Sequence, residues 1–243
     1  NEEIKKKNLS LFRFEPFMYL KDFNRVNRET NSIGKLSVEE IDDFLTKNSD
    51  LIVILHYRWT LKILEMHFDN EEGYREEGKS NLIYKDYLEP INVKNSSQQQ
   101  RQKYIADEII SRINFIINNG HKLIIVYPVP EMGFNVPRLL NSKFIKNRTY
   151  SSEFSVPILS GSYEVFKKRN KTTFEILDNV KSPNIYRVYP HKFFCNSQIK
   201  DRCVANDKEN IFYHDDDHLS LQGSKYVIDE IMKKIKLIEF KSN

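Results

Sequence analysis

The chain has 243 residues, 40% of them hydrophobic and 12% aromatic, which suits one large folded domain and argues against a disordered chain. Its 38 Lys and Arg against 34 Asp and Glu leave a net charge of only +4, too mild to indicate nucleic-acid binding. No apolar run approaches the ~20 residues of a membrane span. The chain begins with Asn and lacks an initiator Met, so we expect it to be cut from a longer protein.

Helix and strand patterns alternate in the first half. Residues 38–48 carry apolar side chains on one helical face, and the apolar run 51–55 predicts a buried strand. Residues 60–98 are polar, and we interpret them as an irregular insertion. Residues 98–120 form the clearest helical pattern, with isoleucines at helical spacing before Gly120, a residue suited to end a helix.

The second half continues this alternation. Residues 123–129 predict a second buried strand, and residues 131–160 look irregular. A helix is predicted over 162–180, a short strand over 184–190 and a last helix over 220–238.

Apolar strands that alternate with helices predict an α/β fold with a parallel sheet covered on both faces. Active sites of such sheets lie at the carboxyl ends of the strands. The polar stretches 56–59, 127–131 and 213–218 all follow strands or lie in the loops beyond them, so we expect them to meet at one edge.

Two cysteines, Cys195 and Cys203, lie eight residues apart in a polar loop. They are either two free thiols or a disulfide that closes a small loop, and the disulfide requires an oxidising compartment. A structural zinc site would need four ligands, and no second Cys or His pair stands at finger spacing, so we expect no metal there.

The segment "IFYHDDDHLSLQG" places three aspartates between His214 and His218. It could be a solvated run of charge or a divalent-metal cluster, although neighbouring side chains diverge. A third interpretation uses only Asp215 and His218. Three residues apart at a helix start, they can lie on one side of a turn, where the carboxylate fixes the histidine tautomer. The other ring nitrogen is then a general base for a hydroxyl nucleophile. His214 is interpreted as a loop residue.

Four segments carry a resemblance to a known family. "FYHDDDHLSLQGSKYV" resembles the Asp-x-x-His block of SGNH-type esterases, and more narrowly the SGNH domains fused to membrane acyltransferase-3 proteins. "DLIVILHYRW" resembles the strand of that family that ends in an Arg-Trp pair, and "LIIVYPVPEMGFNVPRLL" its Pro-x-Pro-Glu stretch. "YPHKFFCNSQIKDRC" resembles its paired-cysteine loop. The resemblance covers residues 50–235.

The resemblance implies a flavodoxin-like three-layer α/β/α sandwich, the SGNH hydrolase fold, as a single domain over residues 1–243. The domain would be the extracytoplasmic, periplasmic part of a longer membrane protein. It would move acyl groups, usually acetyl, onto a cell-surface glycan such as lipopolysaccharide O-antigen or capsule. The acyl group would come from the membrane acyltransferase domain of the same protein, and no cofactor would be needed.

The resemblance also implies residue roles. His218 would be the base and then the acid of a Ser–His–Asp triad, and Asp215 would orient it. The family's nucleophile is the Ser of a Gly-Asp-Ser block, which this chain does not contain. The nucleophile is therefore unknown, and Ser10 is a candidate in poor context. Arg58 and Trp59 would stabilise an oxyanion or bind substrate, or else be a surface arginine and a core tryptophan.

Three alternatives stay open at this point. The first is an esterase on the same fold that removes acetyl groups from glycans. The second is a catalytically silent glycan-binding domain that has lost its nucleophile. The third is a metal-dependent phosphoesterase that uses the aspartate cluster.

Overall fold

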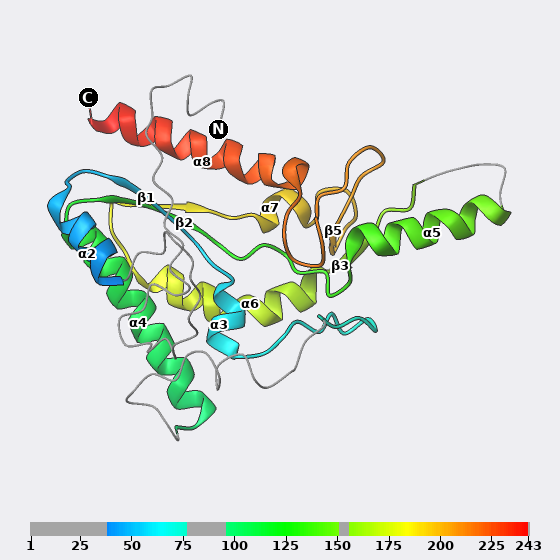
Figure 1. Ribbon diagram of the computed structural model, residues 1–243, viewed down its shortest axis with the longest axis horizontal. Coiled ribbons are helices and arrows are strands. Elements are labelled where there is room, and N and C mark those ends of the chain that lie inside the picture. Colours follow the sequence, from blue (N-terminus) through cyan, green and yellow to red (C-terminus); the bar gives the residue numbers. More distant parts are fainter. Residues whose placement is uncertain (1–37, 77–95, 151–155, 243) are drawn as a thin grey trace.

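A three-stranded parallel sheet forms the centre of the protein (Figure 1). The computed structural model describes residues 38–76, 96–150 and 156–242. The strands are β1 (Ile52–His56), β2 (Lys122–Val126) and β4 (Ile185–Val188), in the order β1-β2-β4. Their register places His56 beside Val126 and Val126 beside Val188. The three carboxyl ends therefore reach one edge of the sheet.

Helices cover both faces of this sheet (Figure 1). One face carries α2 (Val38–Lys47), α3 (Trp59–Leu64), α4 (Gln98–Asn118) and α6 (Tyr163–Asn179), and the other carries α8 (Leu221–Ser242). Successive strand residues point to opposite faces, so Ile125 of β2 packs in the core under α4 while Ile124 packs against α8. The α/β/α layering with a parallel sheet confirms the predicted fold class.

Helix α4 shows how closely local sequence determines these elements. The Ser97 side chain accepts from the Gln100 backbone N–H, and the Gln100 side chain accepts from the Ser97 N–H, which forms a capping box. The isoleucines that predicted the helix are buried, and Ile113 and Ile116 are fully so. Burial of each such side chain stabilises the fold by about 1.5–3 kcal/mol. Gly120 follows with a φ of +85°, which L side chains rarely adopt.

The prediction that residues 131–160 are irregular is wrong for α5 (Val136–Tyr150), which extends away from the sheet in Figure 1. The Asn135 side chain accepts from the Arg138 backbone N–H at 3.0 Å and so caps the helix start. Pro137 stands in the first turn, where its missing N–H costs no helical hydrogen bond. The Asn-x-Pro order was the available signal for this helix.

The interpretation of residues 60–98 as an irregular polar insertion is also wrong in its first part. Residues 60–64 belong to α3, and Leu61 and Ile63 are buried in it. The Thr60 hydroxyl bonds to the side chains of Asn170 and Thr173 on α6, so α3 is fastened to the helical layer. Residues 77–95 lie outside the described residues.

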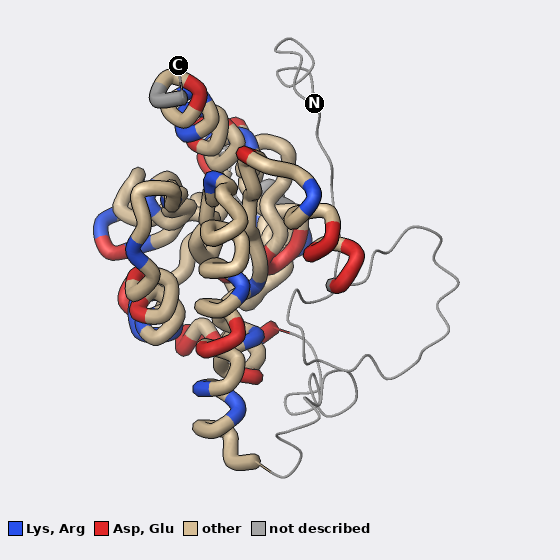
Figure 2. The backbone as a smooth tube through the Cα atoms, turned by 90° about the vertical axis from the view of Figure 1, so that its left-hand side faces the viewer, with Lys and Arg blue, Asp and Glu red and all other residues tan. Residues whose placement is uncertain are grey.

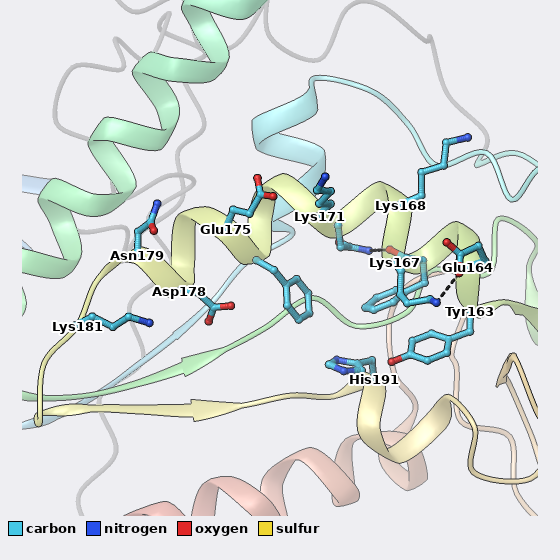
Figure 3. A pocket seen from close by; sticks show the side chains of 13 residues that line it. Tyr163, Glu164, Lys167, Lys168, Lys171, Glu175, Asp178, Asn179, Lys181 and His191 are labelled. Carbon is cyan, nitrogen blue, oxygen red and sulfur yellow. Dashed lines mark hydrogen bonds and ion pairs between the residues drawn. The ribbon is translucent and has the colours of Figure 1, made fainter.

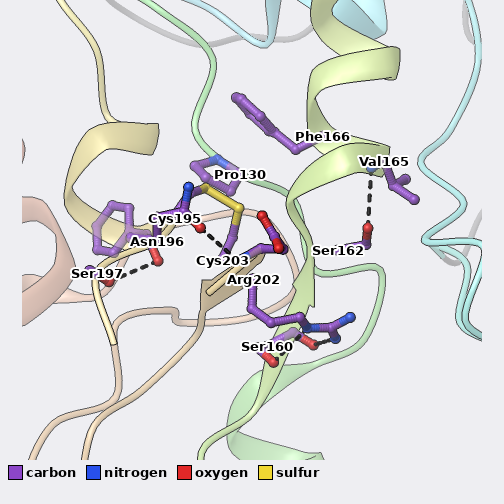
Figure 4. Close-up of a disulfide and its surroundings, with 12 residues drawn as sticks. Pro130, Ser160, Ser162, Val165, Phe166, Cys195, Asn196, Ser197, Arg202 and Cys203 are labelled. Atoms are coloured by element: carbon purple, nitrogen blue, oxygen red, sulfur yellow. Dashed lines mark hydrogen bonds between the residues drawn. A yellow bond between two sulfur atoms is a disulfide. The ribbon is translucent and has the colours of Figure 1, made fainter. Parts of the chain in front are cut away.

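The disulfide alternative for the cysteine loop is confirmed: Cys195 and Cys203 are bonded (Figure 4). The loop between them starts after the short helix α7 (His191–Phe194) and returns as β5 (Arg202–Val204). Strand β5 pairs antiparallel with β3 (Ser160–Ser162), a small second sheet that the sequence did not predict. Both cysteines are buried in the core that this sheet shares with Phe194 and Phe212.

Replacing Cys195 and Cys203 together with alanine is expected to lower the free energy of unfolding by about 2.5 kcal/mol. The bond joins residues eight apart, and closing a loop of that size removes this much chain entropy from the unfolded state. Urea unfolding of the double variant and of the oxidised protein measures the difference. Equal midpoints would show that the bridge does not restrict the unfolded chain.

None of the described helices has both the length and the apolar composition that a bilayer crossing requires. On the side of the molecule that Figure 2 shows, basic and acidic segments are interspersed over the described elements.

Candidate active site

Three segments that are far apart in sequence meet beyond the carboxyl ends of the strands. Arg58 follows β1, Glu131 follows β2, and Asp217 lies in the loop before α8, and both carboxylates form ion pairs with Arg58. The Tyr213 hydroxyl donates to the Pro130 carbonyl at 2.7 Å and holds that loop against the exit of β2. The predicted meeting of these polar stretches at one edge is confirmed.

The start of α8 fixes the shape of the acidic loop. The Ser220 hydroxyl oxygen accepts from the Gly223 backbone N–H at 3.2 Å and caps the helix. A Cβ on Gly223 would lie 2.1 Å from the carbonyl oxygen of Phe212, so no other residue fits this close approach. These two contacts account for the Leu-Ser-x-x-Gly order after His218.

Asp215 organises the acidic loop around His218. One carboxylate oxygen, Oδ1, accepts from the backbone N–H groups of Asp217 and His218 at 3.0 and 2.8 Å. The other, Oδ2, lies 2.8 Å from Nδ1 of the His218 ring. This contact favours the tautomer that carries its proton on Nδ1, which leaves Nε2 as a proton acceptor. The His218 side chain is 67% exposed, so an incoming hydroxyl can reach the ring.

The charges of the loop shift its protonation equilibria in opposite directions. Partial burial opposes ionisation of Asp215, but the hydrogen bonds from the His218 and Asp217 N–H groups outweigh it and lower the Asp215 pKa to about 2. Burial also acts to lower the pKa of His218, yet the carboxylates of Asp217 and Asp215 raise it overall. Asp215 is therefore a fixed negative charge that stabilises an imidazolium at His218.

Most of the Arg58 donors are engaged by carboxylates. Its Nη1 and Nη2 donate to both carboxylate oxygens of Glu76 at 2.9 and 3.0 Å, and Nη2 also donates to Glu131 at 2.8 Å. Its Nε lies 2.6 Å from Oδ2 of Asp217. The surface-arginine alternative fails too, because three carboxylates surround this guanidinium. Arg58 instead joins the exits of β1 and β2 to the acidic loop.

Trp59 is a core residue, the second of the two alternatives weighed for it. Its side chain is 4% exposed, and its indole N–H donates to the Val126 carbonyl at the end of β2 at 2.8 Å. That bond fixes α3 against the sheet and so sets the position from which the neighbouring Arg58 reaches the loop.

Three residues of this cluster were not found from the sequence. Asp217 was recognised only as part of the acidic run, and Glu131 only as part of a Pro-x-Pro-Glu stretch. Glu76 lies in the segment interpreted as an insertion. Nothing in the local pattern marks any of them, because their common partner, Arg58, is 18 to 159 positions away along the chain.

Acid should weaken the fold through Glu76. Burial opposes its ionisation, but the bonds from Arg58 dominate and lower the Glu76 pKa to about 2. An unfolded Glu titrates near 4.3, so between that pH and about 2 the unfolded chain binds a proton that the folded chain does not. This contribution to stability is present above pH 4.3 and is lost as the pH falls.

We expect this group to contribute about 1.5 kcal/mol less to the free energy of unfolding at pH 3 than at pH 4.5. Urea unfolding at both pH values compares the protein with Glu76→Gln, which has no carboxyl to titrate. The variant should lose less stability on acidification. An identical loss in both proteins would contradict the lowered pKa.

Asp215, Asp217 and His218 each offer an atom within 4.8 Å of the others, a spacing that could hold a metal ion. Two observations oppose a resident cation. Oδ1 of Asp217 already faces Nδ1 of His218 at 2.9 Å, and Oδ2 faces the cationic Arg58. A divalent ion bound to Asp217 would have to displace the His218 ring from Oδ1 and would be repelled by the positive charge of Arg58.

Comparison with known protein families identifies the family of the chain. Residues 4–233 match the profile of a family described as "SGNH domain (fused to AT3 domains)". The chain belongs to this family. The match extends the resemblance recognised over residues 50–235 almost to the start of the chain.

One solved structure with a similar chain is the "Structure of Salmonella ser. Paratyphi A lipopolysaccharide acetyltransferase periplasmic domain". It is 18% identical to this SGNH domain, with a TM-score of 0.39, and the match covers 60% of this chain and 53% of that one. This SGNH domain thus spans about half the length of the chain that it matches. No protein among those with curated descriptions matches it significantly.

The described residues do not identify a nucleophile for this SGNH domain. In residues 38–76, 96–150 and 156–242, no serine hydroxyl is hydrogen-bonded to His218. Ser10, the early candidate, lies outside the described residues. The described part of the candidate site consists of Asp215, His218 and the charged residues that contact them.

A cavity of about 630 Å³ lies away from this pair (Figure 3). It runs along α6 beside His191, and its lining includes Tyr163, Lys171 and Phe174 but none of the acidic-loop residues. Burial lowers the pKa of His191 to about 4, so its ring is neutral at physiological pH, and none of the described residues bonds to its Nδ1. The contact between a carboxylate and an exposed imidazole lies in the acidic loop, outside this cavity.

Proposed function

We propose that this SGNH domain transfers an acyl group, acetyl in the first instance, to a hydroxyl of a cell-surface glycan. The observation that carries the proposal is the exposed His218 ring, held by Asp215 at Nδ1 with Nε2 free to accept a proton. Membership in a family fused to AT3 domains supports an acyl chemistry and a membrane acyltransferase partner in the same protein.

The reaction runs through an acyl-enzyme. Nε2 of His218 takes the proton from a serine hydroxyl as its oxygen attacks the acyl carbonyl, and the imidazolium that forms is stabilised by Asp215. Collapse of the tetrahedral intermediate expels the donor's leaving group, which takes the proton from His218. An acceptor hydroxyl then repeats the sequence: it gives its proton to His218, attacks the acyl-serine and releases the serine as the ester forms. These steps need no cofactor.

The same proposal places the domain in the periplasm, where the membrane domain would deliver the acyl group from a cytoplasmic donor. The disulfide between Cys195 and Cys203 supports this location, because such bonds persist in oxidising compartments. The serine would come from outside the described residues.

The test supplies a radiolabelled acetyl donor to the membrane protein that carries this domain, with purified lipopolysaccharide as acceptor. Acetyl-lipopolysaccharide should form faster than free acetate, and Asp215→Asn should slow both products. Free acetate alone would show an esterase instead, since the two activities share the acyl-enzyme and differ in the acceptor. Glycan binding without either product would show a silent binding domain.

A metal-dependent phosphoesterase is the second candidate, and it rests on the spacing of Asp215, Asp217 and His218. Chelation separates it from acyl transfer. Acetyl transfer should persist in EDTA, because the proposed steps move protons only between side chains and substrate. Phosphatase activity that EDTA abolishes and a divalent ion restores would favour the metal.

A further inference from the structure

Two carboxylates meet the same nitrogen of His218. Nδ1 lies 2.8 Å from Oδ2 of Asp215 and 2.9 Å from Oδ1 of Asp217. The two partners differ in environment, since the Asp215 side chain is 30% exposed and that of Asp217 is 7% exposed. One ring N–H is thus placed between an open carboxylate and a buried one.

We propose that Asp217 is a second positioning residue for His218, and that Arg58 holds Asp217 in place for that role. The inference deepens the proposed function, because it concerns the same histidine, and it rests on that function. In this arrangement the imidazole is oriented from two directions, by Asp215 within the loop and by Asp217 from the interior.

Arg58 is suited to this task because its own position is fixed. Glu76 binds two of its nitrogens, and Glu131 binds one of them as well. Glu131 is held in turn by Nε of Arg169 on α6 at 2.6 Å. A continuous series of ion pairs therefore runs from the helical layer through Glu131 and Arg58 to Asp217 and the ring of His218. Partners of this kind orient a reacting histidine without contacting the substrate.

The charges around Asp217 decide how the pair responds to pH. Arg58 and His218 face it directly, and Asp215 and Asp216 lie beside it in the loop. Burial raises the pKa of Asp217, the two neighbouring carboxylates add to the rise, and Arg58 and His218 oppose it. Two further carboxylates, Glu76 and Glu131, pair with Arg58 from other elements. The hydroxyl of buried Tyr213 interacts electrostatically with Asp217. His56, at the end of β1, interacts electrostatically with His218. An ionised Asp217 adds a second negative charge at Nδ1 and favours the imidazolium.

The proposal predicts a lower pKa for His218 when Asp217 loses its charge. NMR titration of the His218 ring in EDTA-containing buffer should show a fall of about one unit or more in Asp217→Asn. Asp216→Asn is the matched control, since Asp216 is adjacent in sequence but has no contact with the ring, and it should move the His218 pKa less than a third as far. A His218 pKa unchanged in Asp217→Asn would overturn the proposal.

A double variant separates the two carboxylates. If Asp217 contributes, Asp215→Asn alone should leave the His218 pKa above that of Asp215→Asn/Asp217→Asn. If Asp215→Asn and the double variant give the same His218 pKa, Asp217 has no role at the ring. These titrations need no turnover, so they stand even where the acyl-transfer proposal fails. Where transfer is measurable, Asp217→Asn should shift the acid limb of its pH profile downward by the same amount as the His218 pKa.

Discussion

Replacing His218 with alanine is expected to lower acyl transfer by about 10³- to 10⁴-fold. The ring is the only group of the described site positioned both to take a proton from a hydroxyl and to have its positive charge stabilised by a neighbouring carboxylate. Rates of acetyl-lipopolysaccharide formation by the two proteins measure the loss. Its size separates a general base from a residue that only binds substrate.

The matched control is His214→Ala on the same loop. His214 is exposed, and its structural contact is made by its backbone N–H, which donates to the His218 carbonyl at 2.7 Å. Its activity should stay within about twofold of the unmodified protein, as expected for a surface change. Both variants should keep their unfolding midpoints, because neither ring is buried. Retained turnover in His218→Ala would exclude the triad mechanism.

Replacing Arg58 with glutamine is expected to lower the free energy of unfolding by about 3 kcal/mol. Glu76 and Asp217 would lose their arginine partner while their side chains remain 11% and 7% exposed, and each would keep only a histidine whose charge depends on pH. Removing the permanent cation from a buried carboxylate is costly, whereas Glu131 would keep Arg169. Urea unfolding at neutral pH measures the loss.

Arg75→Gln is the control for this variant. Arg75 pairs with Asp69 in the same segment as Glu76, but its side chain is 65% exposed, so its loss should cost about 0.5 kcal/mol or less. Equal effects of the two changes would show that the ion pairs of Arg58 are as well solvated as a surface pair, and that the acidic loop is held by other contacts.

The sheet and its main helices could be predicted because their signals are local. The isoleucines of α4 repeat with the period of a helix, and the apolar runs of β1 and β2 have the length of strands. Helix α5 was missed although its first turns place Val136, Leu139 and Leu140 at helical spacing against the core around Phe194. The rest of the helix projects from the fold (Figure 1).

The candidate site could be predicted only where its partners are close in sequence. Asp215 and His218 lie three residues apart and were found from spacing. The partners of Arg58 are brought to it by the loops after β1 and β2 and by the loop before α8, so their pairing is a property of topology. Arg58 was considered for substrate binding because the sequence places a cation at a strand exit. The sequence does not show that three carboxylates engage this cation.

Labelling with a fluorophosphonate tests most directly the claim that His218 activates a serine. Both this chain and the proposed longer protein that carries the AT3 domain are treated, and the labelled peptide is mapped by mass spectrometry. One serine should label in the longer protein, and His218→Ala should remove the label. Folded proteins in which no serine labels, or in which labelling persists without His218, would contradict the acyl-enzyme mechanism.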